Sequence, residues 1–204
     1  MSIIPITLAV EDDLSEITLR RIFNASRKSY AAKCIYRRQG FGYLKKNITA
    51  FNNAAKGCPW LVLTDLDQAE CPPLLAADWF GHLPKQQNLI FQVAVREVEA
   101  WLLADSKAFA HFARIRVGLI PQEVESIPEP KAFLIDLIRR SKRRVIREAI
   151  VPPPGRTQGP GYNACLAEYV NQYWNPANAK LRSPSLDRLV RLLDGFRPAW
   201  PTSY

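Results

Sequence analysis

The chain has 204 residues, enough for one full domain or for one domain with a small appendage. Apolar residues make up 48% and charged residues 23%, a composition that argues against intrinsic disorder. The sequence contains neither a bilayer-spanning apolar stretch of about 20 residues nor a signal-peptide pattern, so we expect a cytoplasmic protein with no membrane association. Lys and Arg total 28 against 19 Asp and Glu, and the net charge of +9 favours a polyanionic partner, nucleic acid first.

Short apolar runs alternate with amphipathic stretches through the first hundred residues. The apolar runs predict strands, and stretches with apolar residues at helical spacing predict helices. This alternation predicts an α/β fold in which a mostly parallel four-stranded sheet is flanked by helices. The expected strands are Ile3–Val10, Cys34–Tyr36, Pro59–Thr64 and Leu89–Val95. The expected helices are Ser15–Ser29, Tyr43–Lys56 and Pro72–Phe80, followed by an amphipathic segment at Glu97–Leu103.

Beyond about residue 105 the pattern predicts a mainly helical extension. A stretch rich in Pro and Gly at 152–161 predicts a loop, and Ser183 and Ser185 supply helix-start chemistry. The expected helices are Phe133–Ile150, Tyr162–Trp174 and Ser185–Phe196. We therefore divide the chain into a catalytic domain, 1–110, and a basic helical extension packed on it, 111–204.

Acidic residues follow three of the expected strands. Glu11 comes after the first, Asp65 and Asp67 after the third, and Glu97 and Glu99 after the fourth. Ligands of open α/β sheets bind at the carboxyl ends of the strands, so these clusters are expected at one sheet edge. Carboxylates are preferred ligands of Mg²⁺ and Mn²⁺, and such ions catalyse phosphodiester displacement. At the start of a helix Glu97 and Glu99 point in different directions, so we expect one of them, preferably Glu99, to complete the site.

Each acidic motif also has a plainer explanation. Asp is common in turns, so Asp65 and Asp67 taken alone are better explained by turn chemistry than by a metal site. Asp12 or Asp13 is expected to cap the helix that follows, which leaves Glu11 unexplained. The metal-site hypothesis therefore depends on the occurrence of acidic residues at both strand ends, Glu11 at one and Asp65 with Asp67 at the other.

An apolar strand ending in Glu11, followed some fifty residues later by one ending in Asp65 and Asp67, resembles the Toprim domain of topoisomerases, bacterial primases and OLD-type nucleases. The closer likeness is to a family of small bacterial Toprim-like proteins, related to OLD nucleases, whose function is unassigned. The segments that carry this likeness are 11–16 (EDDLSE), 63–71 (LTDLDQAEC) and 95–105 (VREVEAWLLAD).

The resemblance implies that Glu11, Asp65 and Asp67 bind Mg²⁺ or Mn²⁺ and act on phosphodiester bonds of DNA or RNA. It also implies a partner ATPase of the OLD or SMC kind and a role in defence against phage. Many Toprim domains have Gly after the strand-one Glu, where this chain has Asp12. That departure supports an alternative, a catalytically inactive scaffold that binds and regulates an ATPase or nucleic acid. A third possibility is phosphoryl chemistry on a small phosphoester, and self-association of the chain is left open.

Basic residues on expected helices are candidates for phosphate contacts. A charged run on a helix is more often a solvated face, and the same patch could dock an acidic ATPase. No G-x-x-x-x-G-K-[ST] loop is present, so we expect no ATP hydrolysis by the chain itself. The candidates are Lys45, Lys46, Arg139, Arg140, Arg143 and Arg144.

Overall fold

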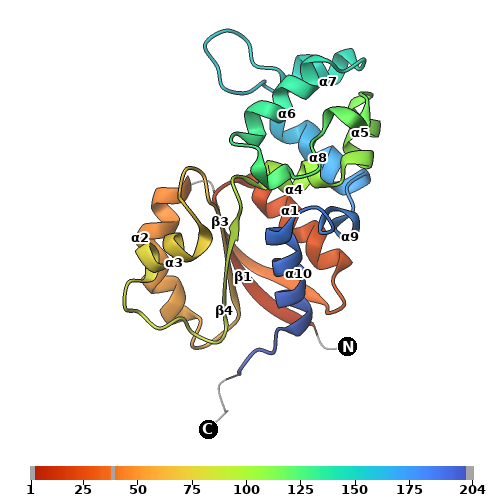
Figure 1. The fold of residues 1–204 in the computed structure, drawn as a ribbon. Helices are drawn as coiled ribbons and strands as arrows, with labels where there is room; N and C mark the ends of the chain where they lie inside the picture. The colour runs from red at the N-terminus through yellow and green to blue at the C-terminus, as the bar shows by residue number, and fades with distance from the viewer. Residues whose placement is uncertain (1–2, 38–39, 201–204) are drawn as a thin grey trace. The chain divides into compact units, whose positions relative to one another are not determined.

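The computed structural model describes residues 3–37 and 40–200, which contain one parallel sheet and a series of helices (Figure 1). The strand order is β2-β1-β3-β4, and every neighbouring pair is parallel. The strands are β1 (Ile4–Val10), β2 (Tyr30–Tyr36), β3 (Trp60–Asp65) and β4 (Leu89–Ala94). The expected α/β class, a four-stranded parallel sheet of Rossmann-like type with a helical C-terminal region, is confirmed.

The chain divides into two compact units. The sheet unit contains Met1–Val95 and Arg188–Tyr204, and the helical unit contains Arg96–Asp187. This division differs from the expected one at residue 110. The helical unit begins at Arg96, whose φ of +66° lies in the left-handed region. The last segment of the chain belongs to the sheet unit, where the carbonyl of Leu193 accepts a hydrogen bond from the Tyr30 hydroxyl.

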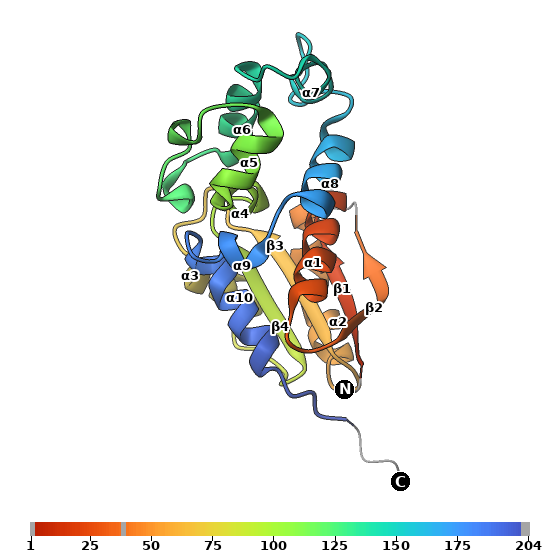
Figure 2. The same ribbon diagram turned by 90° about the vertical axis from the view of Figure 1, so that its right-hand side faces the viewer.

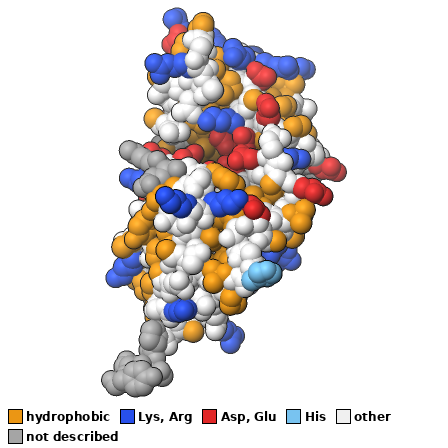
Figure 3. All heavy atoms as spheres, turned by 90° about the vertical axis from the view of Figure 1, so that its left-hand side faces the viewer, with side chains coloured by type: hydrophobic (Ala, Val, Ile, Leu, Met, Phe, Trp, Pro, Cys, Tyr) orange, Lys and Arg blue, Asp and Glu red, His pale blue; other side chains and the backbone are white. Residues whose placement is uncertain are grey.

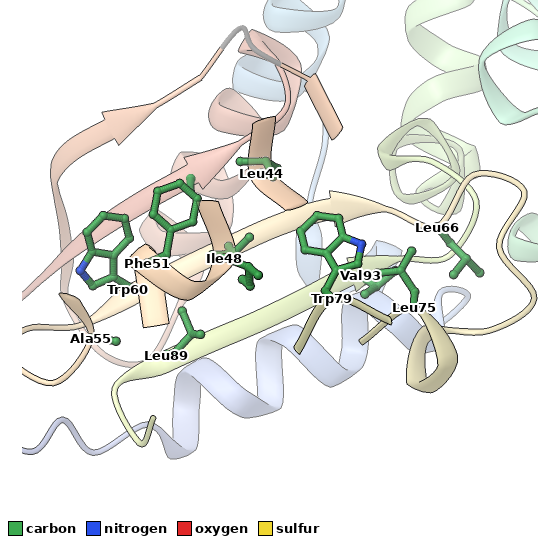
Figure 4. Close-up of a cluster of buried hydrophobic side chains, with 12 residues drawn as sticks. Leu44, Ile48, Phe51, Ala55, Trp60, Leu66, Leu75, Trp79, Leu89 and Val93 are labelled. Atoms are coloured by element: carbon green, nitrogen blue, oxygen red, sulfur yellow. The ribbon is translucent and has the colours of Figure 1, made fainter. Parts of the chain in front are cut away.

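Helices cover both faces of the sheet. Helices α2 (Gly40–Ala54) and α3 (Pro72–Phe80) lie on one face, and α1 (Asp13–Ala25) lies on the other (Figures 1 and 2). Under α2 and α3 the core combines aliphatic side chains with aromatic rings, and the centroids of the stacked Phe51 and Trp60 rings lie 5.1 Å apart (Figure 4). Burying such rings is the main contribution to holding the helices on the sheet.

Several boundaries in the sheet unit differ from those expected. β2 starts at Tyr30, four residues early, because as an edge strand it is only partly buried and lacks a clear apolar run. Helix α2 starts at Gly40, before the expected start at Tyr43, so the glycines at 40 and 42 belong to the helix. Helix α1 starts at Asp13 with Asp12 as its cap, in agreement with the capping expectation.

The helical unit is built around buried aromatic side chains. Trp101 is fully buried and its indole N–H donates to the Ser185 hydroxyl at 2.7 Å. The expected helix Phe133–Ile150 is wrong as a single element, since it is interrupted at Ser141, whose hydroxyl donates to the Ala113 carbonyl. The helices of this unit are α4 (Val98–Ala104), α5 (Ser106–Ala113), α6 (Pro130–Arg139), α7 (Arg144–Ile150), α8 (Tyr162–Gln172) and α9 (Pro176–Ala179), with short 3₁₀ turns η1 (Val117–Leu119) and η2 (Val124–Ser126). Helix α10 (Pro184–Gly195) starts in this unit and continues into the sheet unit.

No helix in the described part of the chain is both long enough and apolar enough to cross a membrane.

Gly159 is expected to be the position least tolerant of a methyl group in the helical unit. A Cβ there would lie 2.3 Å from the carbonyl oxygen of Ala149, whereas at Gly118 nothing lies within 4 Å. We expect Gly159→Ala to lower the free energy of unfolding by about 1–3 kcal/mol, as overpacking does. Gly118→Ala should be neutral or slightly stabilising, because it only restricts the unfolded chain. Urea unfolding of both variants measures the difference, and equal stabilities would contradict it.

Glu16 gives the sheet unit a pH-dependent contribution to stability. Its carboxylate is buried on α1 and accepts hydrogen bonds from Arg20 (2.8 Å) and Arg37. Burial raises the pKa of Glu16, but the hydrogen bonds and charges of the two arginines outweigh it, and the pKa lies below its usual 4.5. A lowered pKa in the folded state means that the contribution is present above the unfolded pKa and is lost as pH falls through the folded pKa.

We therefore expect Glu16→Gln to reduce stability by about 1–2 kcal/mol at pH 7. The difference from wild type should shrink as the pH falls below the usual pKa of a Glu side chain. Thermal unfolding between pH 3 and pH 7 tests this, and a constant difference across the range would show that the charge of Glu16 contributes nothing.

Candidate functional site

The candidate site lies where the strand order reverses. β1 and β3 are neighbours, but the chain continues from β1 to β2 on one side and from β3 to β4 on the other. In open α/β sheets such a switch point opens a crevice outside the carboxyl ends of the strands, and ligands bind there. Glu11 directly follows β1 and Asp65 is the last residue of β3. The sheet therefore brings both carboxylates to the switch point.

Glu11 is held across the two strands. Its Oε1 accepts a hydrogen bond from the Thr64 hydroxyl at 2.6 Å and another from the backbone N–H of Asp65 at 2.9 Å. These bonds fix the carboxylate of β1 over the end of β3. Burial raises the pKa of Glu11, while the two hydrogen bonds lower it. The nearby charges of Asp67 and Asp12 raise it again, and the pKa stays above its ordinary value.

Asp65 and Asp67 flank a buried anchor. Leu66 is 3% exposed, packs in the core under α2 and α3 (Figure 4), and donates its N–H to the Ala94 carbonyl at 2.8 Å. Asp67 then turns the chain, with a φ of +49° that Asp tolerates better than most residues. Burial raises the pKa of Asp67, although the residue reaches solvent. The charge of Asp67 is close enough to Glu11 to raise the pKa of that residue.

Asp12 acts as a helix cap. Its Oδ1 accepts from the N–H of Ser15 at 2.8 Å, at the amino end of α1. Its backbone is extended, with φ of −147° and ψ of −179°. An extended backbone is open to any residue, so this position does not need the conformational freedom of Gly.

The amino end of α2 approaches the switch point. The N–H of Gly40 donates to the carbonyl of Glu11 at 3.4 Å. Lys45 and Lys46 follow on the same helix and are exposed, and Lys45 forms an ion pair with Asp78 at 2.7 Å. Lys and Arg side chains are spread over this face and form no single patch in the view of Figure 3. The structure thus places the two lysines on a helix that begins at the site.

Glu97 and Glu99 belong to the helical unit, and both accept hydrogen bonds within it. Glu97 Oε2 accepts from the N–H of Lys131 at 2.6 Å, in the first turn of α6, where negative charge is favourable. Glu99 is 6% exposed and its Oε1 accepts from the Tyr162 hydroxyl at 2.7 Å. Each glutamate therefore has a structural role within the helical unit, and their part in a metal site stays a prediction.

The predicted arginine cluster spans the end of α6 and the start of α7. Arg139 pairs with Asp136 at 3.3 Å and Arg144 with Glu148 at 2.6 Å. Arg143 Nη1 donates to the Phe112 carbonyl at 3.1 Å. Arg140 is exposed at the end of α6. Most of the cluster is thus engaged within the helical unit.

The acidic residues at the switch point fit a hard divalent cation. Carboxylate oxygens are the ligands that Mg²⁺ and Mn²⁺ prefer. Burial raises the pKa of Glu11 and so disfavours its ionised form, which a bound cation would stabilise. Among the residues that the structure describes, no three or more His, Cys, Asp or Glu side chains lie together in a group that could hold a metal ion. Mg²⁺ commonly uses only one or two carboxylates together with waters and substrate phosphates. One or two carboxylates from among Glu11, Asp65 and Asp67 would suit that kind of site.

Thr64 is a site residue that the sequence analysis did not single out. It is the polar residue that ends the apolar run of β3, just before Asp65, and it is 1% exposed. A buried hydroxyl at that place needs a partner, and Glu11 supplies it. The feature of the sequence that could have identified Thr64 is its position, one residue before a strand-end carboxylate.

Comparisons of the chain with protein-family models, curated proteins and solved structures gave no match.

Proposed function

We propose that the protein is a divalent-metal-dependent nuclease that hydrolyses phosphodiester bonds of DNA or RNA. The observation that carries this proposal is the carboxylate of Glu11, bonded across the switch point to the end of β3, with Asp65 and Asp67 beside it. The resemblance of these strand ends to the Toprim domain supports the same chemistry. The excess of basic residues is what a nucleic-acid substrate requires.

The chain's own residues have distinct tasks in this proposal. Asp65 and Asp67 would hold Mg²⁺ or Mn²⁺, and Glu11, oriented by Thr64, would hold the ion or accept a proton from the attacking water. When bound, the ion stabilises the charge on the attacking and leaving oxygens and lowers the pKa of water. The buried Leu66 keeps the two aspartates in place on either side of it.

The cellular setting follows from the resemblance alone. We propose a cytoplasmic protein that works with an ATPase of the OLD or SMC kind in defence against phage. A catalytically inactive scaffold remains the alternative, because Asp12 stands where many Toprim domains have Gly. The extended backbone of Asp12 and its role as the cap of α1 give that residue a structural explanation, which supports the catalytic proposal over the inactive scaffold.

A cleavage assay tests the proposal. Supercoiled plasmid, linear duplex, single-stranded DNA and RNA are incubated with the protein in Mg²⁺, in Mn²⁺ and in EDTA, with mononucleotides as a separate substrate. We expect metal-dependent cleavage of at least one polynucleotide and none in EDTA. Turnover of mononucleotides alone, or binding of polynucleotide with no cleavage under any condition, would contradict the proposal.

A further inference from the structure

The helical unit contains a hollow of about 580 Å³ that is rich in positive charge. It lies where α5 and α6 end, and η1 forms part of its wall. Of the described residues that line it, none is acidic. The lining residues are Arg114, Ile115, Arg116, Leu119, Arg140 and Lys142. We call it the basic hollow.

Its four cationic side chains are exposed and uncompensated. In the described part of the chain, the side chains of Arg114, Arg116, Arg140 and Lys142 take part in no hydrogen bond or ion pair. Neighbouring arginines differ: Arg139, Arg143, Arg144 and Arg147 each donate to a carboxylate or a backbone carbonyl. Like charges gathered round one hollow repel each other, and an anionic ligand would relieve that repulsion.

Helix capping does not explain these cations. The carboxyl end of a helix attracts positive charge, but the last carbonyls of α5 already have partners: Arg143 donates to Phe112 and Ser141 to Ala113. The carbonyls of Leu137 and Ile138 at the end of α6 accept from the N–H of Arg140. Each helix end carries roughly half a negative charge, so two ends against four cations leave an excess of roughly three positive charges.

The chemistry of the hollow fits a chain of phosphates. A phosphodiester backbone presents one negative charge per nucleotide, and exposed Lys and Arg neutralise such charges without reading sequence. Ile115 and Leu119 are half-buried and give the hollow an apolar floor, against which a sugar can lie. We propose that the basic hollow binds the sugar–phosphate backbone of a nucleic acid. The inference rests on the proposed function only in naming the polyanion as nucleic acid.

Two matched charge variants of the full chain test this. The first carries Arg114→Gln, Arg116→Gln, Arg140→Gln and Lys142→Gln. The control carries Lys33→Gln, Lys107→Gln, Arg156→Gln and Arg188→Gln, which remove the same charge from exposed positions outside the hollow. Binding of fluorescent single-stranded and duplex oligonucleotides is measured by anisotropy in EDTA over a range of salt. Without metal, loss of binding is distinguishable from failure of the proposed cleavage.

The hollow variant should bind duplex at least 100-fold more weakly at low salt, with a log–log salt slope shallower by roughly three, since each lost phosphate contact removes about 0.9. The control should lose less than tenfold. Circular dichroism establishes that both variants are folded. Equal losses of affinity in the two variants would show that binding depends only on the net charge of the protein, and they would overturn the inference. Polyglutamate that competes as well as the oligonucleotide would assign the hollow to an acidic protein partner and overturn it too.

Discussion

Replacing both Asp65 and Asp67 with Asn is expected to lower metal-dependent cleavage by at least about 1,000-fold, since loss of a single electrostatic stabiliser commonly costs 100- to 1,000-fold. Asn keeps the size and the turn-forming ability of Asp, and it is tolerated at the left-handed φ of residue 67. The fold should therefore persist, because Leu66 still anchors the strand end in the core. The variant is compared with wild type in the cleavage assay, on whichever polynucleotide wild type cleaves.

Glu70→Gln is the matched control for this variant. Glu70 is an exposed carboxylate on the loop that follows β3, and the proposal gives it no ligand role. We expect its cleavage rate to lie within about twofold of wild type. Cleavage that persists in the Asp65→Asn, Asp67→Asn variant would remove the acidic site from the mechanism, whatever the source of the activity.

Two substitutions of Glu11 are expected to separate its contribution to stability from its contribution to cleavage. Glu11→Gln keeps a side-chain oxygen that accepts the hydrogen bonds from the Thr64 hydroxyl and the Asp65 N–H. Glu11→Ala removes that oxygen and leaves both donors without this acceptor. The alanine variant should lose about 1–3 kcal/mol of stability, the cost of unsatisfied buried groups. The glutamine variant should keep its stability, yet cleave at least about 100-fold more slowly, because the charge is gone.

The raised pKa of Glu11 predicts the direction of the stability change in the glutamine variant. A carboxyl whose pKa is higher in the folded state destabilises the fold when it is ionised, so a neutral amide should leave stability unchanged or raise it in EDTA. Adding Mn²⁺ should raise the melting temperature of wild type and leave that of Glu11→Gln unmoved. Equal cleavage by the glutamine variant and wild type would show that Glu11 serves only to join β1 and β3.

The parts of the fold that the sequence predicts are those with strong local patterns. β1, β3 and β4 are continuous apolar runs, and α3 begins at a proline pair, so their limits fall within a residue or two of those observed. β2 was foreseen only in part, because an edge strand with one half-buried face gives a weak pattern. The break at Ser141 depends on a bond to Ala113 in another helix, which no local pattern reveals.

The juxtaposition of Glu11 and Asp65 could be predicted because it depends on topology. Once β1 and β3 are parallel neighbours, Glu11 and Asp65 must meet at one edge, and the two strand ends can be read from the sequence. The bond from Thr64 to Glu11 and the left-handed turn at Asp67 depend on side-chain geometry and could not be read in the same way. The basic hollow gathers residues that follow α5 and α6, together with η1. The local charge run predicted one of these residues, Arg140, but not Arg114, Arg116 or Lys142.

Binding of Mn²⁺ tests the central claim most directly, because it needs neither a substrate nor a partner. The free ion is titrated with protein and followed by electron paramagnetic resonance, for wild type, for Asp65→Asn with Asp67→Asn, and for Glu70→Gln. We expect wild type and Glu70→Gln to bind alike, and the double variant to bind at least about 10- to 100-fold more weakly, since even outer-shell changes cost that much. Equal Mn²⁺ binding by wild type and the double variant would contradict the metal site at the ends of β1 and β3.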